Sequence, residues 1–293
     1  MRIGITDSGV GGLSVCAELE ARLCRSPVRE DIEVLYLNAA IEDHYAYNSM
    51  PDRLTKLRAF DRFLSSVQQN YQLDMLYIAC NTLSILFEDP YFDHYRHIPI
   101  EGIVDTGVMK MCREFESDSN VTFVVFAAPT TIEEAVYGSR LREHGVPANH
   151  IIEQACPGLP DAISNDGSGQ LAGKLLAGFI TSAFEKMDHK PDHVLAYLGC
   201  THYGYQAARF EAILDTLVEK ATILNPNNGA VDQILSHVNM TAGSGKLKIE
   251  FVARYVIPGV VIESLSMYIG EKAPKTLSAL VNATHFPELC GAL

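Results

Sequence analysis

"LYIACNTLSIL" (residues 76–86) reads as a buried strand that ends at Cys80, and "LAYLGCTHYGY" (residues 195–205) repeats this plan with an apolar strand that ends at Cys200. Short polar side chains follow both thiols directly: Asn81, Thr82, Thr201 and His202. The sequence separation of the two thiols is about the length of one small domain. We therefore expect the two strand ends to act as a pair.

Strand-like and helix-like segments alternate along most of the chain. The β-rich runs are RIGIT, IEVLYL, MLYIA, PIEGIV, VTFVVFAA, HIIEQA, HVLAYLG, ATILN and KIEFVARYV. Amphipathic helical patterns cover residues 52–69, 132–144, 171–186 and 206–219. This alternation predicts an α/β fold with mostly parallel sheets that are flanked by helices on both faces.

Ligands of open α/β sheets bind just beyond the carboxyl ends of the strands. Asp7 and Ser8 follow the first strand, and the two cysteine motifs follow two later strands. A cleft between two similar domains, each presenting one thiol, is the simplest arrangement. The chain would cross between the domains near Pro99 to Glu101 and near Tyr203 to Gln206.

Composition narrows the class of protein. The 293 residues suit two domains, and 47% hydrophobic with 20% charged residues is an ordinary soluble balance. No apolar run approaches the ~18 residues of a membrane span. The start, MRIGITDSGVGG, reads as a strand and a glycine-rich turn rather than a secretory signal. We expect a cytoplasmic protein with no membrane partner.

Charge and cysteine usage exclude further classes. The net charge of −13, without a basic run, argues against nucleic acid as a partner. Seven widely spread cysteines fit free thiols in a reducing compartment. Metal binding is poorly supported, because no two cysteines stand two to four residues apart.

The segment TDSGVGGLSV (residues 6–15) allows a tight turn whose backbone N–H groups face a ligand. It lacks the G-x-G-x-x-G spacing, and LYLNAA (residues 35–40) has no acidic residue that would hold a ribose. A dinucleotide site is therefore not predicted. Asp7 would either take part in chemistry or merely cap the following helix.

The position of each cysteine separates packing from chemistry. Cys16, Cys24 and Cys112 fall in helical patterns, so we assign them to packing. Cys80 and Cys200 are candidate acid/base groups, because a neighbouring imidazole or helix N-terminus lowers the pKa of a thiol. Two thiols on opposite faces of a substrate carbon would invert its configuration without a cofactor. The adjacent carboxylate would be held by Ser8, Asn81, Thr82 and Thr201.

Three motifs give the chain a clear resemblance to the cofactor-independent aspartate/glutamate racemase superfamily, and to glutamate racemase within it. They are DSGVGGLSV (residues 7–15), ACNT (79–82) and LGCTHY (198–203), in the order and at about the spacing of that family. Weaker matches are HYA (44–46), TTIEEAVY (130–137) and ACP (155–157). The resemblance covers most of the chain up to about residue 230.

The resemblance implies a site and a fold. Cys80 and Cys200 would be the catalytic thiols, assisted by Asp7 and His202. The substrate-binding residues would be Ser8, Asn81, Thr82, Thr201, Tyr45, Ala46 and Thr131. Two pseudo-symmetric domains would be formed by residues 1–98 with 206–293 and by residues 99–205. No NAD, pyridoxal phosphate or metal is expected, and a homodimer fits the family.

The periphery departs from the family pattern. His44-Tyr45-Ala46 stands where glutamate racemases carry Pro-Tyr-Gly, and Ala128 and Glu134 replace a Thr and a Ser. Ser164 falls where the family places an acidic residue, with Asp161 and Asp166 nearby. Glu134 would repel an acidic substrate if it pointed inward, or would lie on a solvated helix face.

These observations predict an isomerase that interconverts L- and D-glutamate, a small acidic amino acid, and so supplies D-glutamate for peptidoglycan. The alternatives are a racemase of aspartate or another carboxylate, an isomerase or decarboxylase with the same cleft, and a binding protein that has lost turnover. Residues 270–293 match no motif; they would cover the cleft, mediate association or simply pack.

Overall fold

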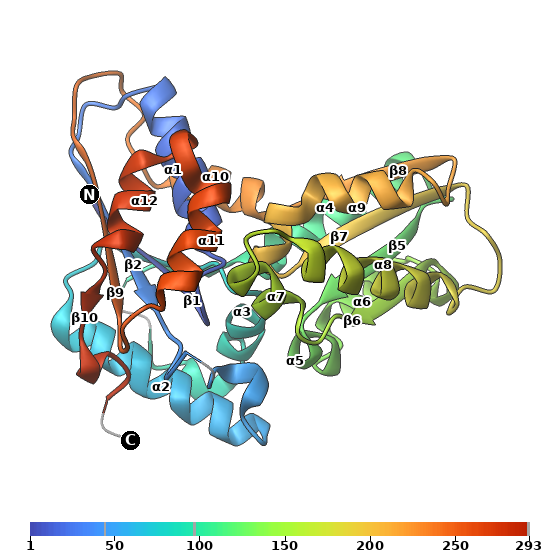
Figure 1. The fold of residues 1–293 in the computed structure, drawn as a ribbon, viewed down its shortest axis with the longest axis horizontal. Helices are drawn as coiled ribbons and strands as arrows, with labels where there is room; N and C mark the ends of the chain where they lie inside the picture. The colour runs from blue at the N-terminus through green and yellow to red at the C-terminus, as the bar shows by residue number, and fades with distance from the viewer. Residues whose placement is uncertain (44, 96–97, 292–293) are drawn as a thin grey trace.

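The alternating pattern folds into two parallel sheets in the computed structural model, which describes residues 1–43, 45–95 and 98–291. The first sheet has the order β10-β9-β2-β1-β3-β4 and the second the order β6-β5-β7-β8, and every pairing is parallel. Figure 1 shows the sheets as separate lobes, with the second sheet drawn in colours that run from green through yellow to orange. The α/β prediction is confirmed.

The strands of the first sheet come from both ends of the chain: β1 (Arg2–Asp7), β2 (Ile32–Asn38), β3 (Met75–Ile78), β4 (Ile100–Gly102), β9 (Leu247–Ala253) and β10 (Thr284–His285). The second sheet uses one continuous stretch: β5 (Thr122–Ala127), β6 (Ile151–Ala155), β7 (His193–Gly199) and β8 (Lys220–Leu224). Long crossovers link the strands, as parallel pairing requires.

Helices cover these sheets and fill the crossovers. They are α1 (Leu13–Arg25), α2 (Arg53–Asn70), α3 (Asn81–Phe87), α4 (Ile103–Ser117), α5 (Pro129–Glu133), α6 (Val136–Glu143), α7 (Leu159–Asn165), α8 (Gln170–Phe184), α9 (Ala207–Leu214), α10 (Pro226–Ser236), α11 (Gly259–Ile269) and α12 (Pro274–Val281). Within the described ranges, no helix is both long and apolar enough to cross a bilayer.

Helix α2 shows how sequence sets this packing. Asp52 caps its first turn, because the side chain accepts a hydrogen bond of 2.8 Å from the backbone N–H of Thr55. Its buried apolar residues recur at helical spacing and pack on one face of the first sheet: Leu57, Phe60, Phe63, Leu64 and Val67. The predicted helix over 52–69 is therefore confirmed.

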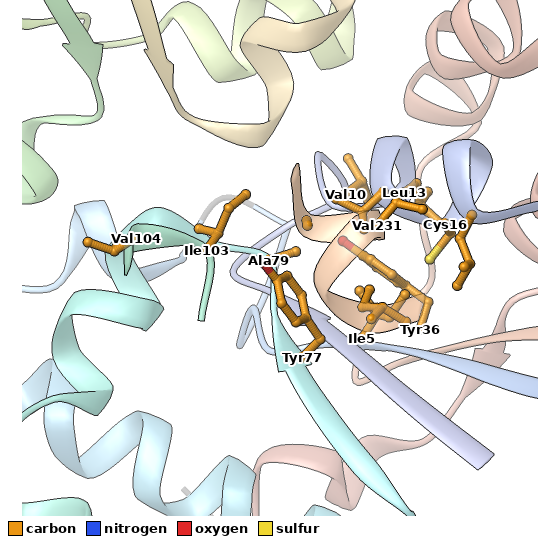
Figure 2. Close-up of a cluster of buried hydrophobic side chains, with 14 of the residues drawn as sticks. Ile5, Val10, Leu13, Cys16, Tyr36, Tyr77, Ala79, Ile103, Val104 and Val231 are labelled. Carbon is orange, nitrogen blue, oxygen red and sulfur yellow. The ribbon is translucent and has the colours of Figure 1, made fainter. Parts of the chain in front are cut away.

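The opposite face of the first sheet carries the largest apolar cluster. Figure 2 shows Ile5, Tyr36 and Tyr77 from three neighbouring strands lying together beneath Leu13 and Cys16 of α1. Cys16 is fully buried, and Cys112 packs against the same cluster. Cys24 is exposed at the end of α1, so its assignment to packing is wrong. All seven cysteines are free thiols, as predicted.

The pairing of two strands can be compared with the predicted domain boundaries. The division of the chain into two domains remains a proposal. Ile100–Gly102 pairs with β3 of the first sheet, and Lys220–Leu224 pairs with β7 of the second. By sheet membership, the proposed division at 98/99 and 205/206 would move beyond these two strands. Strand order is a long-range property, so local sequence patterns gave no access to it.

The predicted single helix over 132–144 is wrong. Helix α5 ends at Glu133 and α6 begins at Val136, because Ala135 adopts the left-handed conformation with φ of 51°. This conformation costs an L-residue about 1–2 kcal/mol. Alanine normally continues a helix, so the sequence carries no signal for the break.

The final segment packs on the first lobe. The Glu20 carboxylate, 1% exposed on α1, accepts hydrogen bonds from the backbone N–H groups of Lys275 and Thr276 at the start of α12. Strand β10 then extends the first sheet beyond β9, and Cys290 is buried against α2 and its neighbours. Of the three roles considered for residues 270–293, packing is the one that the described residues show.

Candidate active site

The carboxyl ends of β1, β3 and β7 meet at one cavity of about 110 Å³. Its walls include polar groups from all three strand ends and from the two lobes: Asp7, Ser8, Asn81, Thr82, Thr201 and His202. Both cysteines, Cys80 and Cys200, line the same cavity. The two strand endings that the sequence paired are therefore brought together in space.

Cys80 follows β3 at the position before the first residue of α3 and is 6% exposed. Its Sγ lies 3.1 Å from the Ser8 Oγ. Burial raises the pKa of the Cys80 thiol to about 12, the negative charge of Asp7 adds to this effect, and the Ser8 contact opposes it. The uncharged thiol is thus the resting form at neutral pH.

Cys200 follows β7 and precedes a short 3-10 helix, η4 (Thr201–Gln206). Its Sγ lies 3.7 Å from His202 Nδ1. Burial raises the pKa of the Cys200 thiol well above its usual range, and the charge of Asp7 adds to this. Burial also lowers the pKa of His202, against the opposing effects of Asp7 and Asp161. The lowered pKa favours the neutral form of the imidazole that stands beside this thiol.

Asp7 connects the two halves of the cavity. One carboxylate oxygen accepts a hydrogen bond of 2.7 Å from Thr201 Oγ1, and the other accepts one of 3.4 Å from Ser8 Oγ. The carboxylate is 2% exposed. Asp7 therefore does not cap α1, whose N-cap position is Gly12; its carboxylate contacts a residue next to each thiol.

The glycine-rich turn makes this close approach possible. A Cβ on Gly11 would overlap His202 and the Thr201 hydroxyl, and one on Gly12 would stand 2.9 Å from an Asp7 carboxylate oxygen. Any side chain at Gly11 would displace the motif that carries Cys200. The glycines therefore serve the close packing of these two motifs.

The proposed substrate-binding residues divide into two groups. Ser8, Asn81, Thr82, Thr201 and Ala46 line the cavity. Thr131 lies behind the wall, where its hydroxyl is 2.8 Å from that of Thr82. Tyr45 is 37% exposed and is not part of the wall, while His44 lies outside the described residues. Thr131 is thus placed to support Thr82 rather than to touch a ligand.

The residues that depart from the family pattern lie partly in the cavity wall and partly outside it. Ala128, Ser164 and Asp161 line the cavity, whereas Asp166 accepts a hydrogen bond of 2.8 Å from the backbone N–H of Leu171 in α8. Glu134 neither faces a ligand nor lies free in solvent. It forms an ion pair of 3.0 Å with Arg53, and its side chain is 19% exposed. Its charge is therefore compensated.

Part of the wall comes from residues that sequence reasoning missed. Tyr255, Ile257 and Val261, in the last sixth of the chain, close one side of the cavity together with Pro160 and Asn165 of the second lobe. Tyr255 also accepts a hydrogen bond of 3.4 Å from Asn38 Nδ2 at the end of β2. Apolar residues that belong to no motif cannot be distinguished from core residues in a sequence. Their place in the cavity wall becomes clear only in the structure, where the chain returns to the first sheet at β9.

Two parallel sheets, each presenting one thiol to a shared cavity, form the arrangement that the resemblance to the aspartate/glutamate racemase superfamily implies. The glutamate racemase of Campylobacter jejuni is 29% identical over 259 residues, covering 86% of this chain and 92% of that protein. That of Clostridium acetobutylicum is 26% identical over 255 residues, covering 84% and 90%. No family model matches the chain.

Solved structures agree on the fold. The glutamate racemase of Francisella tularensis, solved in complex with D-glutamate, superposes with a TM-score of 0.69 at 21% identity, covering 92% of this chain and 93% of that one. A glutamate racemase isoform of Bacillus anthracis gives 0.68 at 21% identity, covering 92% and 94%. The resemblance to the superfamily, and to glutamate racemase within it, is confirmed.

Proposed function

We propose that this protein is an amino-acid racemase that interconverts L- and D-glutamate, with Cys80 and Cys200 as its two acid/base groups. The observation that carries the proposal is that thiols from two different lobes line one cavity. Each thiol has its own polar partner, Ser8 at 3.1 Å and His202 at 3.7 Å. The glutamate racemases to which the chain is similar support the choice of substrate.

The chemistry needs no oxidant and no reductant. One cysteine, as a thiolate, removes the proton from Cα, and the C–H electron pair passes into the adjacent carboxylate. The opposite thiol then gives its proton to the other face of the carbon, and its S–H electron pair stays on sulfur. The product has the inverted configuration, and the two cysteines have exchanged protonation states.

The neighbours of each thiol would make the thiolate. Cys80, whose pKa is raised to about 12, loses its proton only when an acceptor is near, and the Ser8 hydroxyl leads from its sulfur to the Asp7 carboxylate. On the opposite side, His202 Nδ1, 3.7 Å from the Cys200 sulfur, would take the proton of this thiol. Burial raises the pKa of the thiol and lowers that of the imidazole, so the resulting ion pair is the minor form. Asp7 and His202 therefore assist from the two faces.

Neutral donors would hold the substrate carboxylate. Among the described residues that form the wall there is no Lys or Arg. The hydroxyls of Ser8, Thr82 and Thr201 and the amide of Asn81 are thus the groups available for hydrogen bonds, together with backbone N–H groups of the turn after Asp7. Such donors stabilise the negative charge that develops when the Cα proton leaves.

Proton NMR in D₂O tests the proposal. L-glutamate and L-aspartate are incubated separately with the protein, while loss of the α-proton signal and decay of optical activity are followed together. Exchange with racemisation of glutamate is the expected result. Racemisation of aspartate alone would replace the substrate, and silence with both would overturn the proposed reaction.

Two cysteine variants test the assignment of the catalytic groups. Cys80→Ser and Cys200→Ser should each lower racemisation by about 10²–10⁴-fold, because each removes one acid/base group. Cys24→Ser, at the exposed thiol of α1, is the matched control and should leave the rate unchanged. Full activity of either cavity variant would exclude a mechanism with two thiols.

The cellular role and the assembly state of the protein are also proposed. D-glutamate made by the enzyme would supply peptidoglycan synthesis in the cytoplasm, and the protein would work as a homodimer or a monomer without nucleic acid. Light scattering at working concentrations decides the assembly state.

A further inference from the structure

A chain of two buried tyrosines leads from the core to Asn81, which lines the cavity next to Cys80. Tyr137 of α6 donates a hydrogen bond to Asn81 Oδ1. The hydroxyl of Tyr197, on β7, lies 2.9 Å from that of Tyr137 and 3.5 Å from the same Oδ1. Both tyrosines are fully buried, so these hydroxyls have little contact with solvent.

The other end of the Asn81 carboxamide has no such partner. Nδ2 is buried, and no hydrogen-bond acceptor for it exists among the residues that the structure describes. A buried polar group without a partner costs about 1–3 kcal/mol, so it usually marks a place where a ligand or water binds. Because the tyrosines hold the oxygen end, the amide end is the part of Asn81 that is left without a partner beside the cavity that this residue lines.

The packing around the two tyrosines leaves space for their hydroxyl groups. A Cβ on Gly107, in α4, would overlap the Tyr197 hydroxyl, so the glycine leaves the space that the hydroxyl occupies. The two tyrosine rings lie 4.8 Å apart between centroids at an angle of 51°, which fixes the position of both hydroxyls. The pair therefore comes from two elements of the second lobe and acts on a residue of the first.

We propose that Tyr137 and Tyr197 are positioning residues that turn Asn81 so that it presents only N–H donors to the cavity, and that these donors bind a carboxylate of the substrate. The inference rests on the proposed racemase function for the identity of that substrate. A carboxylate only accepts hydrogen bonds, so a donor-only amide matches it. A freely turning amide would present its oxygen part of the time and repel the same group.

Steady-state kinetics with glutamate tests the inference. Asn81→Ala should raise KM about 10–100-fold, the range for a lost hydrogen bond to a charged group. Tyr137→Phe and Tyr197→Phe should each raise KM about 3–10-fold, with a smaller change in kcat. The matched control is Tyr77→Phe, which removes a buried hydroxyl that donates to Gln233 and does not touch Asn81. Its KM should stay at the wild-type value.

A double-mutant cycle separates positioning from a general loss of stability. In the Asn81→Ala background, Tyr137→Phe should change KM less than about 2-fold, because the group that it positions is gone. Additive effects of the two changes, or an unchanged KM in the tyrosine variants, would overturn the inference. Melting temperatures of all variants identify any change that merely unfolds the protein.

An NMR measurement without substrate keeps this test apart from that of the proposed function. In protein labelled with [¹⁵N]asparagine, the Asn81 side-chain amide is assigned by its loss in Asn81→Ala. Its heteronuclear NOE should report a rigid group in wild type and in Tyr77→Phe, and a more mobile one in Tyr137→Phe/Tyr197→Phe. An equally rigid amide in that double variant would refute the positioning role even if glutamate were not the substrate.

Discussion

The two halves of the cavity follow one plan but differ in what surrounds the thiol. Cys80 faces a hydroxyl, Ser8, which leads to the Asp7 carboxylate, whereas Cys200 faces the imidazole of His202. Asp7 is an acidic group, and His202 is a base whose pKa is lowered by burial. In the proposed reaction, the two thiols would therefore have chemically different proton acceptors.

The halves also differ in how the fold supports them. The Cys200 half depends on close packing against the glycine turn of the first lobe, since a side chain on Gly11 would overlap both Thr201 and His202. The Cys80 half depends on hydroxyls and amides around the start of α3, such as the contact between Thr82 and Thr131. Changes at the two places should consequently have different signatures.

The largest effect is expected from Asp7→Asn, which removes a carboxylate that contacts both halves. The variant keeps the shape of the side chain but loses the charge, so racemisation should fall by about 10²–10⁴-fold in both directions. Initial rates of racemisation and of α-proton exchange in D₂O, from L- and from D-glutamate, measure this. Asp188→Asn, at an exposed position, is the control. A loss confined to one direction of exchange would show that Asp7 serves only one thiol.

Gly11→Ala should damage the Cys200 half by displacing His202 and Thr201. We expect activity to fall about 10–100-fold, because a small displacement of catalytic groups is costly. Gly178→Ala in α8 is the matched control, since nothing lies near its added Cβ. It should be neutral or stabilise the helix by up to about 1 kcal/mol. Wild-type kinetics for Gly11→Ala would show that the turn can move away from His202 and Thr201 without loss of activity.

The lowered pKa of His202 predicts acid sensitivity that belongs to the Cys200 half. Below the usual histidine pKa of 6.5, the unfolded chain binds a proton that the folded protein excludes, so stability falls as pH falls until the lower folded pKa is reached. The slope should reach at most about 1.4 kcal/mol per pH unit. Urea unfolding at several pH values measures it.

His202→Gln should flatten this dependence, whereas His189→Gln, at an exposed imidazole, should preserve it. Equal slopes in wild type and His202→Gln would assign the acid sensitivity to other groups.

Thr131→Val should have the smallest effect and should act on the Cys80 half. It removes the hydroxyl 2.8 Å from Thr82 Oγ1 without touching the cavity, so KM should rise about 2–10-fold. Thr181→Val on the exposed face of α8 is the control. A loss of kcat with unchanged KM would instead place Thr131 in the chemical step.

The sequence predicted the candidate site best at the residues that directly follow a strand. Polar groups after β1, β3 and β7 share one edge because parallel strands end together, so Asp7, Cys80 and Cys200 could be paired before the structure was known. Other features depend on long-range contacts. The wall residue Tyr255 and the ion pair of Glu134 with Arg53 join segments whose proximity no local pattern reports.

The origin of the two sheets has a consequence for synthesis on the ribosome. All four strands of the second sheet lie within residues 122–224, so its hydrogen-bond ladder is complete while the rest of the chain is still being made. The first sheet must wait for β9 and β10, and α1 must wait for α12 to satisfy buried Glu20. The first lobe is therefore completed later along the chain than the second, and the cavity gains its last wall only once Tyr255, Ile257 and Val261 have been added.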